Sequence, residues 1–406
     1  MTTERPPVTP GGLLLQPPAA HLQSQWPNNS MHRLQTPDYP MTELPDDEMD
    51  YRKRQHRVSQ ALDVRHLDAL LVTHMPNIRY LCGFTGSAGM LLVADGRSTF
   101  FTDGRYREQG RSEVQGAGVV VPKGPVLDAV ARAVAVSRVK TVGVEGEHMS
   151  VAAETKVARI LRSKARVRQT RRLVEEHRMV KEPAEVERLR AAVRLGSSLF
   201  DKAVAVIRPG VTERAVAAEL EYAARCAGAA GMAFETIVAA GRRSALPHGL
   251  ASLQPIPRRG FVVLDFGVIL AGYCSDMTRT VYVGKPGAEA RRLYQAVWDA
   301  QQAAIAAVRP GRTVGEVDRA ARSVLRRAGL ARYFTHSTGH GVGLEIHEPP
   351  RIAREEEDVL RPGMVITIEP GAYVPGYGGV RIEDMVVVTS TSCEVLTPTP
   401  KELLAV

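Results

Sequence analysis

The chain has 406 residues, 44% of them hydrophobic, and a formal charge of +9, so two or three domains with substantial apolar cores are expected. No apolar run approaches the roughly 20 residues of a membrane-spanning helix, and the N-terminus lacks a basic start followed by an apolar stretch, which excludes an obvious membrane protein. The four cysteines show no CxxC spacing, so we expect neither a disulfide framework nor a zinc knuckle, and a cytoplasmic location.

Residues 1–47 differ in composition from the rest of the chain. They hold nine of the 26 prolines and carry two basic against five acidic residues, with little periodic apolar pattern. Such a segment buries too little apolar surface to offset the entropy lost on ordering. We therefore predict a disordered, proline-rich tail over residues 1–47.

Residues 48–172 have the pattern of a separate N-terminal domain. A strand-like run at 67–73 precedes a turn of small residues, FTGSAG at 84–89, and another apolar run follows at 90–93. The sequence FFTDGRY at 100–106 predicts a strand that ends in a turn. We interpret Asn77, Asp103 and Arg105 as turn and salt-bridge residues rather than catalytic groups.

The densest positive charge of the chain lies at residues 156–172, with eight Lys or Arg and no acidic residue. A basic run of this kind can contact nucleic acid. Aromatic side chains that would stack on bases are absent from it, and no RNA-binding signature is present. We interpret the run as a solvated helix face and interdomain segment, and we expect no nucleic-acid partner.

The third segment, residues 173–406, begins with a linker helix and contains a faint internal repeat. Pro183 suits the first turn of a helix that continues to about residue 200. The sequence IRPGVT at 207–212 recurs as VRPGRT at 308–313, and Ala-Gly at 227–228 recurs at 328–329. In each copy one helix stops at Pro-Gly, and a second helix follows and ends at Gly. The repeat predicts two helix-turn-helix halves around a pseudo-twofold sheet.

Five candidate metal ligands occur in this segment, each in its own local motif. They are Asp265 in LDFG, Asp276 in SDMTRT, His340 in TGHG, Glu369 in IEPG and Glu383 in RIED. Four carboxylates and one imidazole suit two hard divalent cations, because carboxylates can bridge two metals. Each motif alone is weak, since an acidic residue beside a strand commonly caps a turn. Together and in this order they predict a metallohydrolase.

The ordered motifs resemble the pita-bread metallopeptidases, which include aminopeptidase P, prolidase and methionine aminopeptidase. The resemblance is nearly continuous from about residue 178 to the C-terminus. It implies an α+β catalytic domain over 173–406, with a curved, pseudo-twofold antiparallel sheet flanked by helices. Residues 84–89 and 102–106 resemble the smaller α/β N-terminal domain of aminopeptidase P and creatinase.

The resemblance implies a role for each metal ligand. Asp265 and Asp276 would bind the first metal, and His340 and Glu369 the second. Asp276 and Glu383 would bridge the two. Two metals about 3.5–4 Å apart can share one hydroxide, because binding lowers the pKa of water towards roughly 7. The site would thereby supply a nucleophile at neutral pH. Glu369 is also the candidate for passing the proton from this water to the leaving nitrogen. The oxygen-rich site favours Mn²⁺, with Zn²⁺ or Co²⁺ as alternatives.

Four further residues match family positions that contact the substrate. His248 matches a histidine near the metals that contacts the substrate, and His347 matches one that contacts the scissile carbonyl or the intermediate. His336 and Arg381 match positions that shape the pocket in the proline-specific members. A lone histidine is more commonly structural. The motif context favours function for His248, His340 and His347, and it leaves a structural and a functional role equally open for His336 and Arg381.

The favoured activity is that of aminopeptidase P, which removes an N-terminal residue that precedes proline. Prolidase, which cleaves only dipeptides, is the alternative, and the choice depends on whether a loop or a cationic group blocks the pocket beyond proline. Methionine aminopeptidase normally lacks the N-terminal domain. A binding module of the same fold, or metal-independent creatine hydrolysis, is disfavoured because all five ligand positions are filled. The N-terminal domain implies a homodimer or larger assembly, since in aminopeptidase P it often borders the groove of a neighbouring subunit.

Overall fold

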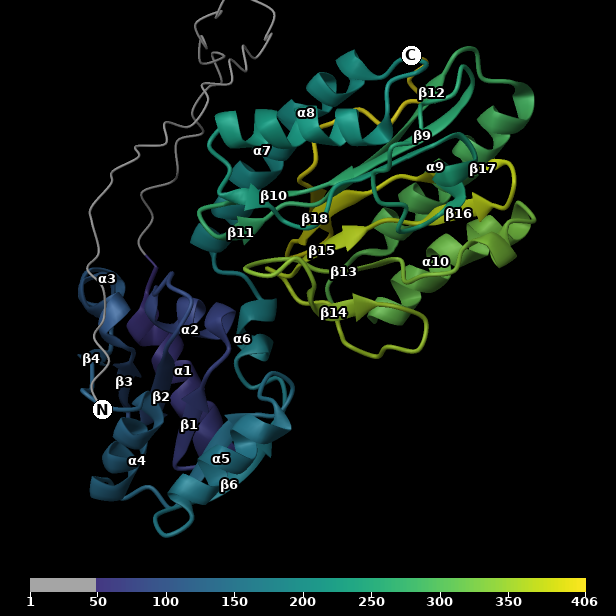
Figure 1. Cartoon of the computed structure of the whole chain (residues 1–406). Helices are drawn as coiled ribbons and strands as arrows, with labels where there is room; N and C mark the ends of the chain where they lie inside the picture. Colours follow the sequence, from purple (N-terminus) through teal and green to yellow (C-terminus); the bar gives the residue numbers. More distant parts are fainter. Residues whose placement is uncertain (1–48) are drawn as a thin grey trace, which may run out of the picture. The chain divides into compact units, whose positions relative to one another are not determined.

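The computed structural model describes residues 49–406, and Figure 1 shows them with most of their helices and strands labelled. The tail predicted over residues 1–47 lies outside the described residues. Two groups of elements follow one another along the described chain. The first contains one large mixed sheet, and the second contains two helix pairs and several antiparallel sheets. Among residues 49–406, no helix combines the length and the apolar character needed to cross a membrane.

The N-terminal elements alternate between helices and strands around a six-stranded sheet of order β4-β3-β2-β1-β5-β6. Strand β1 pairs in parallel with β5 and antiparallel with β2. Because side chains alternate along a strand, β1 directs Leu70 and Val72 to a core with α1 and α2, and Ala69 and Leu71 to a core with α4 and α5. The elements are α1 (Tyr51–Val64), β1 (Ala69–Val72), α2 (Met75–Cys82), β2 (Met90–Ala94), β3 (Arg97–Phe101), α3 (Arg107–Glu113), β4 (Gly118–Val120), α4 (Val126–Val136), β5 (Thr141–Glu145), α5 (Val151–Leu161) and β6 (Arg166–Thr170).

Two expectations for this region are wrong in detail. The basic run is a helix face only at its start, because residues 166–170 form β6, which pairs with β5 at the edge of the sheet. Asn77 is not a turn residue. It is fully buried in α2, where its amide donates to Glu145 and Glu175. Asp103 and Arg105 do form the expected exposed ion pair, at 2.8 Å.

The remaining elements carry the internal repeat. They are α6 (Glu175–Met179), α7 (Pro183–Val206), α8 (Glu213–Cys226), β7 (Gly231–Met232), β8 (Ile237–Ala240), β9 (Gly260–Phe266), β10 (Val268–Leu270), β11 (Tyr273–Cys274), β12 (Met277–Val283), α9 (Ala288–Ala307), α10 (Val314–Arg327), β13 (Gly339–Gly341), β14 (Glu348–Ile352), β15 (Val365–Ile368), β16 (Gly371–Val374), β17 (Gly378–Arg381), β18 (Asp384–Val388) and β19 (Cys393–Val395). Helices α7 and α8 pack on β8, β9 and β12, and α9 and α10 pack on β15 to β18.

The two copies of the repeat have the same local structure. Gly210 and Gly311 follow the first helix of each pair with φ of +90° and +83°, a conformation that glycine adopts without steric cost. Thr212 and Thr313 then cap the second helix, each accepting a hydrogen bond from the backbone N–H three residues later. The recurring Pro-Gly-x-Thr pattern therefore encodes the same tight turn between two helices in each half.

The two halves meet where the SDMTRT and RIED motifs lie side by side. The backbone N–H of Glu383 donates to Thr278 O at 3.1 Å, and the N–H of Arg381 donates to Thr280 Oγ1 at 3.1 Å. These contacts join β12 of the first half to the strands β17 and β18 of the second. Ligands that are distant in sequence are thereby brought to the centre of the molecule.

Candidate metal centre

A pocket of about 730 Å³ lies at this junction and is lined by side chains from both halves. All the candidate site residues take part in its lining. They are His248, Asp265, Asp276, His336, His340, His347, Glu369, Arg381 and Glu383.

The five candidate ligands stand in or beside strands that end at the pocket. Asp265 lies in β9 and His340 in β13, whereas Asp276, Glu369 and Glu383 lie directly next to β12, β15 and β18. One ligand atom from each of Asp276, His340 and Glu383 lies within 4.8 Å of the others. His340 Nε2 is 3.5 Å from both Asp276 Oδ2 and Glu369 Oε1. The fold therefore brings three carboxylates and one imidazole close together, and Asp265 lines the same pocket.

The chemistry of this donor set fits divalent cations. Oδ1 of Asp265 and Oδ1 of Asp276 are buried and have no hydrogen-bond partner among the described residues, an arrangement that is costly unless a cation or water is bound. Burial, followed by the neighbouring carboxylates, raises the pKa of Asp276 and of Glu383 well above the ordinary range. Burial raises the pKa of Glu369 to about 7. Cations would remove this repulsion, and oxygen donors with one imidazole are typical of hard divalent ions.

His340 is oriented to offer one ring nitrogen to the centre. Its Nδ1 lies 3.0 Å from Gly341 O, so Nδ1 carries the proton and Nε2 keeps a lone pair that faces Asp276 and Glu369. Burial, and then the neighbouring His347, lowers the pKa of His340 to about 4. The ring is neutral at physiological pH, as metal ligation requires.

Arg381 organises the wall of the pocket next to Asp265. Its Nη2 donates to Asp265 Oδ2, its Nε to Thr278 Oγ1 at 3.0 Å and its Nη1 to the hydroxyl of Tyr373 at 2.7 Å. The hydroxyl of Thr278 in turn donates to Glu383 Oε2 at 2.7 Å. Arg381 therefore compensates one carboxylate and leaves the others facing each other.

Sequence reasoning missed two members of this arrangement, Thr278 and Tyr373. Thr278 stands two residues after Asp276 in a strand, so the alternation of side chains was a usable signal that it faces the same side. Tyr373 carried no comparable signal. Its hydroxyl joins Arg381 to His336 Nε2, which lies 2.8 Å away. The contact between Tyr373 and Arg381 depends on the pairing of β16 with β17, the strands in which these two residues lie.

The three remaining histidines differ in their surroundings. His336 is held at both nitrogens, since its Nδ1 lies 2.7 Å from Ser337 O, and burial followed by Arg381 lowers its pKa to about 3. His347 stacks edge-on against His340 with ring centroids 4.4 Å apart, and burial lowers its pKa. Within residues 49–406 the rings of His248 and His347 make no hydrogen bond. Their nitrogens are therefore available to a bound molecule.

Comparisons with known proteins agree with this picture. A model of metallopeptidase family M24 matches residues 187–390, and a model of the creatinase/prolidase N-terminal domain matches residues 54–180. An Xaa-Pro dipeptidase from Pyrococcus horikoshii is 36% identical over 86% of this chain and 97% of its own length. Two solved structures cover 88% and 86% of the chain and 100% of their own. They are an Xaa-Pro dipeptidase from Bacillus anthracis (40% identity, TM-score 0.86) and an X-Pro aminopeptidase from Thermotoga maritima (35% identity, TM-score 0.80).

Proposed function

Because the chain belongs to metallopeptidase family M24 and carries a creatinase/prolidase N-terminal domain, we propose that it is a metal-dependent Xaa-Pro dipeptidase. The family and the α+β fold predicted from the ordered motifs are confirmed. The predicted preference for longer peptides is less well supported than its alternative. The relatives from P. horikoshii and B. anthracis are dipeptidases, and the aminopeptidase from T. maritima is less similar to this chain.

An arginine on the pocket wall carries the proposal of dipeptide specificity. Arg351 of β14 pairs with His340 of β13 across the strands, so both side chains project to the same face. Arg351 is exposed and makes no ion pair within residues 49–406, whereas Arg172, which also lines the pocket, pairs with Asp358 at 3.2 Å. A dipeptide ends in a carboxylate one residue beyond the scissile bond, and a guanidinium binds a carboxylate with two parallel hydrogen bonds.

The other residues of the pocket supply binding, orientation and proton transfer. Asp265, Asp276, His340, Glu369 and Glu383 would hold two divalent cations. When bound, such cations polarise the scissile carbonyl and lower the pKa of water. His347 and His248 would donate hydrogen bonds as negative charge develops on the carbonyl oxygen. Glu369 would carry the proton from water to the leaving proline nitrogen.

The preference for proline follows from the missing N–H of its amide. General peptidases handle this bond poorly because proline fixes its own φ and restricts the residue before it. In this chain the pocket wall contains His336 and Arg381, which the hydroxyl of Tyr373 behind them joins by hydrogen bonds at 2.8 and 2.7 Å. We propose that this wall contacts the proline ring. Manganese as the native ion, a homodimer and a cytoplasmic location stay predictions.

The proposal is tested with four peptides and one arginine variant. Wild-type protein loaded with Mn²⁺ should cleave Ala-Pro faster than Ala-Pro-Ala and should leave Ala-Ala uncut. Arg351→Gln should raise KM for Ala-Pro by about tenfold or more, because a charge-assisted hydrogen bond contributes about 1.5–3 kcal/mol. The same substitution should change KM for Ala-Pro-amide, which lacks the carboxylate, by less than about twofold.

The matched control is Arg172→Gln, which removes a pocket arginine that already has a carboxylate partner. It should not distinguish Ala-Pro from its amide. Equal cleavage of Ala-Pro-Ala and Ala-Pro would instead assign an aminopeptidase. Rapid cleavage of Ala-Ala would contradict the proposed preference for proline.

A further inference from the structure

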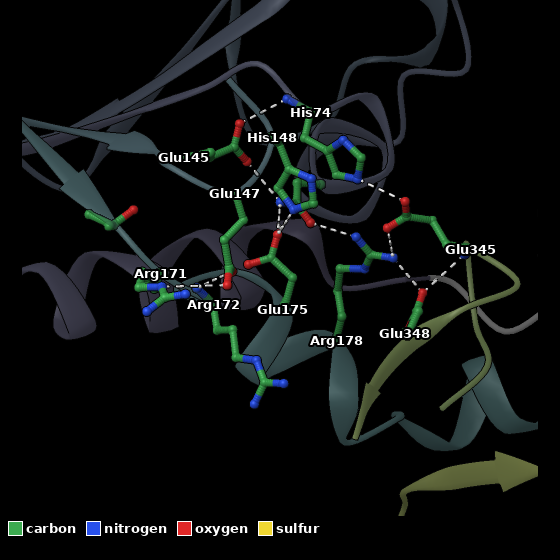
Figure 2. A network of polar contacts seen from close by, with 12 residues as sticks. His74, Glu145, Glu147, His148, Arg171, Arg172, Glu175, Arg178, Glu345 and Glu348 are labelled. Carbon is green, nitrogen blue, oxygen red and sulfur yellow. Dashed lines mark hydrogen bonds and ion pairs between the residues drawn. The ribbon is translucent and has the colours of Figure 1, made fainter. Parts of the chain in front are cut away.

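A second group of charged side chains lies outside the metal centre, where α6 faces the loop between β13 and β14 (Figure 2). We call it the interdomain network. It consists of His74, Asn77, His148, Glu175, Arg178, Lys181, Glu345 and Glu348. Arg178 is its centre and is 3% exposed. Figure 2 shows its guanidinium pointing between the side chains of Glu345 and Glu348.

Arg178 contacts the β13–β14 loop on both sides of two pocket residues. Its Nη2 donates to Glu345 Oε2 at 2.8 Å and to Glu348 Oε1. Ile346 and His347 lie between these two glutamates in sequence, and both line the pocket. The backbone N–H of Glu345 also donates to Glu348 Oε1, at 3.1 Å. One buried guanidinium thus holds the two ends of the short segment that presents His347.

The N-terminal domain anchors the other side of the network. Nη1 of Arg178 donates to Asn77 Oδ1 at 2.7 Å, and His74 Nε2 lies 3.0 Å from Glu345 Oε1. The ring of His74 stacks on that of His148, with centroids 3.7 Å apart, and His148 Nε2 lies 2.8 Å from Glu175. The loop of the pocket is therefore attached to His74, the N-cap of α2, and His148 after β5 supports His74 from the same domain.

The space around the loop is closely filled. A Cβ added to Gly343 would lie 2.6 Å from both carboxylate oxygens of Glu348, closer than such atoms approach. Lys181 Nζ lies 3.2 Å from Glu348 Oε2 and is also buried. Glu348 is thus fixed from several directions, and a change in its position is transmitted directly to the adjacent His347.

The two domains are also joined by a buried arginine that lies away from the interdomain network. Arg54, which is 1% exposed, also links the N-terminal domain to the start of α7, through Glu182 at 3.0 Å and Glu185 at 3.3 Å. Within residues 49–406, Arg54 makes no hydrogen bond or ion pair with the β13–β14 loop. Within residues 49–406, Arg54 and Arg178 are both buried and both join the two domains, and of these two it is Arg178 that holds a segment of the pocket.

We propose that Arg178 is a positioning residue for the reaction, and that through Glu345 and Glu348 it places His347 against the substrate carbonyl. The inference rests on the proposed function for its kinetic readout only. It assigns to the N-terminal domain a part in the geometry of the pocket within the same chain.

A double-mutant cycle between Arg178 and His347 tests the proposal. With the best peptide substrate, Arg178→Met should lower kcat by about tenfold or more, since small misplacements of a catalytic group are costly. In the His347→Ala background the same change should lower kcat by less than about twofold, because the group that it positions is absent. Metal content should stay that of the wild type. Equal losses in both backgrounds would overturn the proposal.

Arg54→Met is the matched control, because it removes a buried interdomain arginine whose hydrogen bonds and ion pairs do not reach the β13–β14 loop. It should lower thermal stability and change kcat by less than about twofold. A loss of kcat equal to that of Arg178→Met would reduce Arg178 to a structural role. If Arg178→Met fails to fold, Glu345→Gln replaces it in the cycle. Glu345 is 32% exposed, so its substitution is better tolerated, and the same non-additivity is expected.

Hydrogen exchange supplies a readout that does not depend on activity. Peptides covering residues 342–349 should exchange faster in Arg178→Met than in wild type and at the wild-type rate in Arg54→Met. Unchanged exchange in Arg178→Met would contradict the proposal even if kcat fell. The wild-type protein could cleave no Xaa-Pro peptide while residues 342–349 still exchange faster in Arg178→Met than in wild type. That result would contradict the proposed function and would still support the positioning of the loop by Arg178.

Discussion

The metal centre and the interdomain network both bury several carboxylates, and they treat the charge in opposite ways. In the metal centre, burial and the neighbouring acids raise the pKa of Asp276 and Glu383. In the network, burial alone would raise the pKa of Glu348, but Arg178 and Lys181 outweigh it and the pKa is lowered. Compensated carboxylates hold the structure together. Buried carboxylates that lack a compensating cation from the protein indicate a site for bound metal ions.

Asp276→Asn should have the largest effect and tests the uncompensated side of this comparison. The substitution removes a ligand from the point where His340 and Glu383 converge, so metal content should collapse. Turnover should fall by about a thousandfold, since metal ions supply several kcal/mol of charge stabilisation. The metal-free variant should nevertheless melt at a higher temperature than metal-free wild type, because one repulsive charge is gone. Metal analysis and calorimetry check both outcomes, and retention of two metals would contradict the assigned ligand.

Lys181→Met should have the opposite consequence for the compensated carboxylates. It removes one of the two buried cations next to Glu348 and leaves part of that charge unpaired. The free energy of unfolding should fall by about 3 kcal/mol, as is usual when one partner of a buried ion pair is lost. Denaturant titration measures this change, and metal content should not alter. An increase in the free energy of unfolding would show that the ion pair between Lys181 and Glu348 does not stabilise the folded chain.

The pH dependence of stability should separate the two regions further. The pKa of Glu369 rises from 4.5 to about 7 through burial, so the folded metal-free chain binds more protons than the unfolded chain between these values. The free energy of unfolding of metal-free protein should therefore decrease by about 3 kcal/mol as the pH rises from below 4.5 to above 7. Saturating Mn²⁺ should abolish the decrease. A flat profile without metal would mean that the carboxylates are compensated after all.

Tyr373→Phe should have the smallest effect and sharpens the boundary of the metal centre. The hydroxyl accepts from Arg381 and donates to His336, so its loss leaves both groups one partner short. We expect turnover to fall by about tenfold, with both metals retained. Tyr377→Phe, in the turn between β16 and β17, is the control and should have no effect on turnover. Loss of metal in Tyr373→Phe would place the tyrosine among the groups that hold the ligands.

Several parts of the molecule were predictable because their signals are local in sequence. Pro183 begins α7 as expected, and the Pro-Gly-x-Thr turns cap α8 and α10 with the same geometry. The five ligand motifs could be recognised because they occur together and in a fixed order, although each motif alone is a weak signal. A turn, a helix cap or a strand end depends on a few consecutive residues, so composition and order are sufficient to identify it.

The sequence by itself determined the family, and it predicted the domain boundaries and the candidate ligands. Only the tertiary structure decided which charges meet. Arg381 binds Asp265 across 116 residues, and Arg178 binds Glu348 across 170. The pairing of β13 with β14 likewise places Arg351 beside His340. Strand register and helix packing determine such partners. Both depend on many weak contacts distributed over the whole fold, so they cannot be read from a short sequence motif.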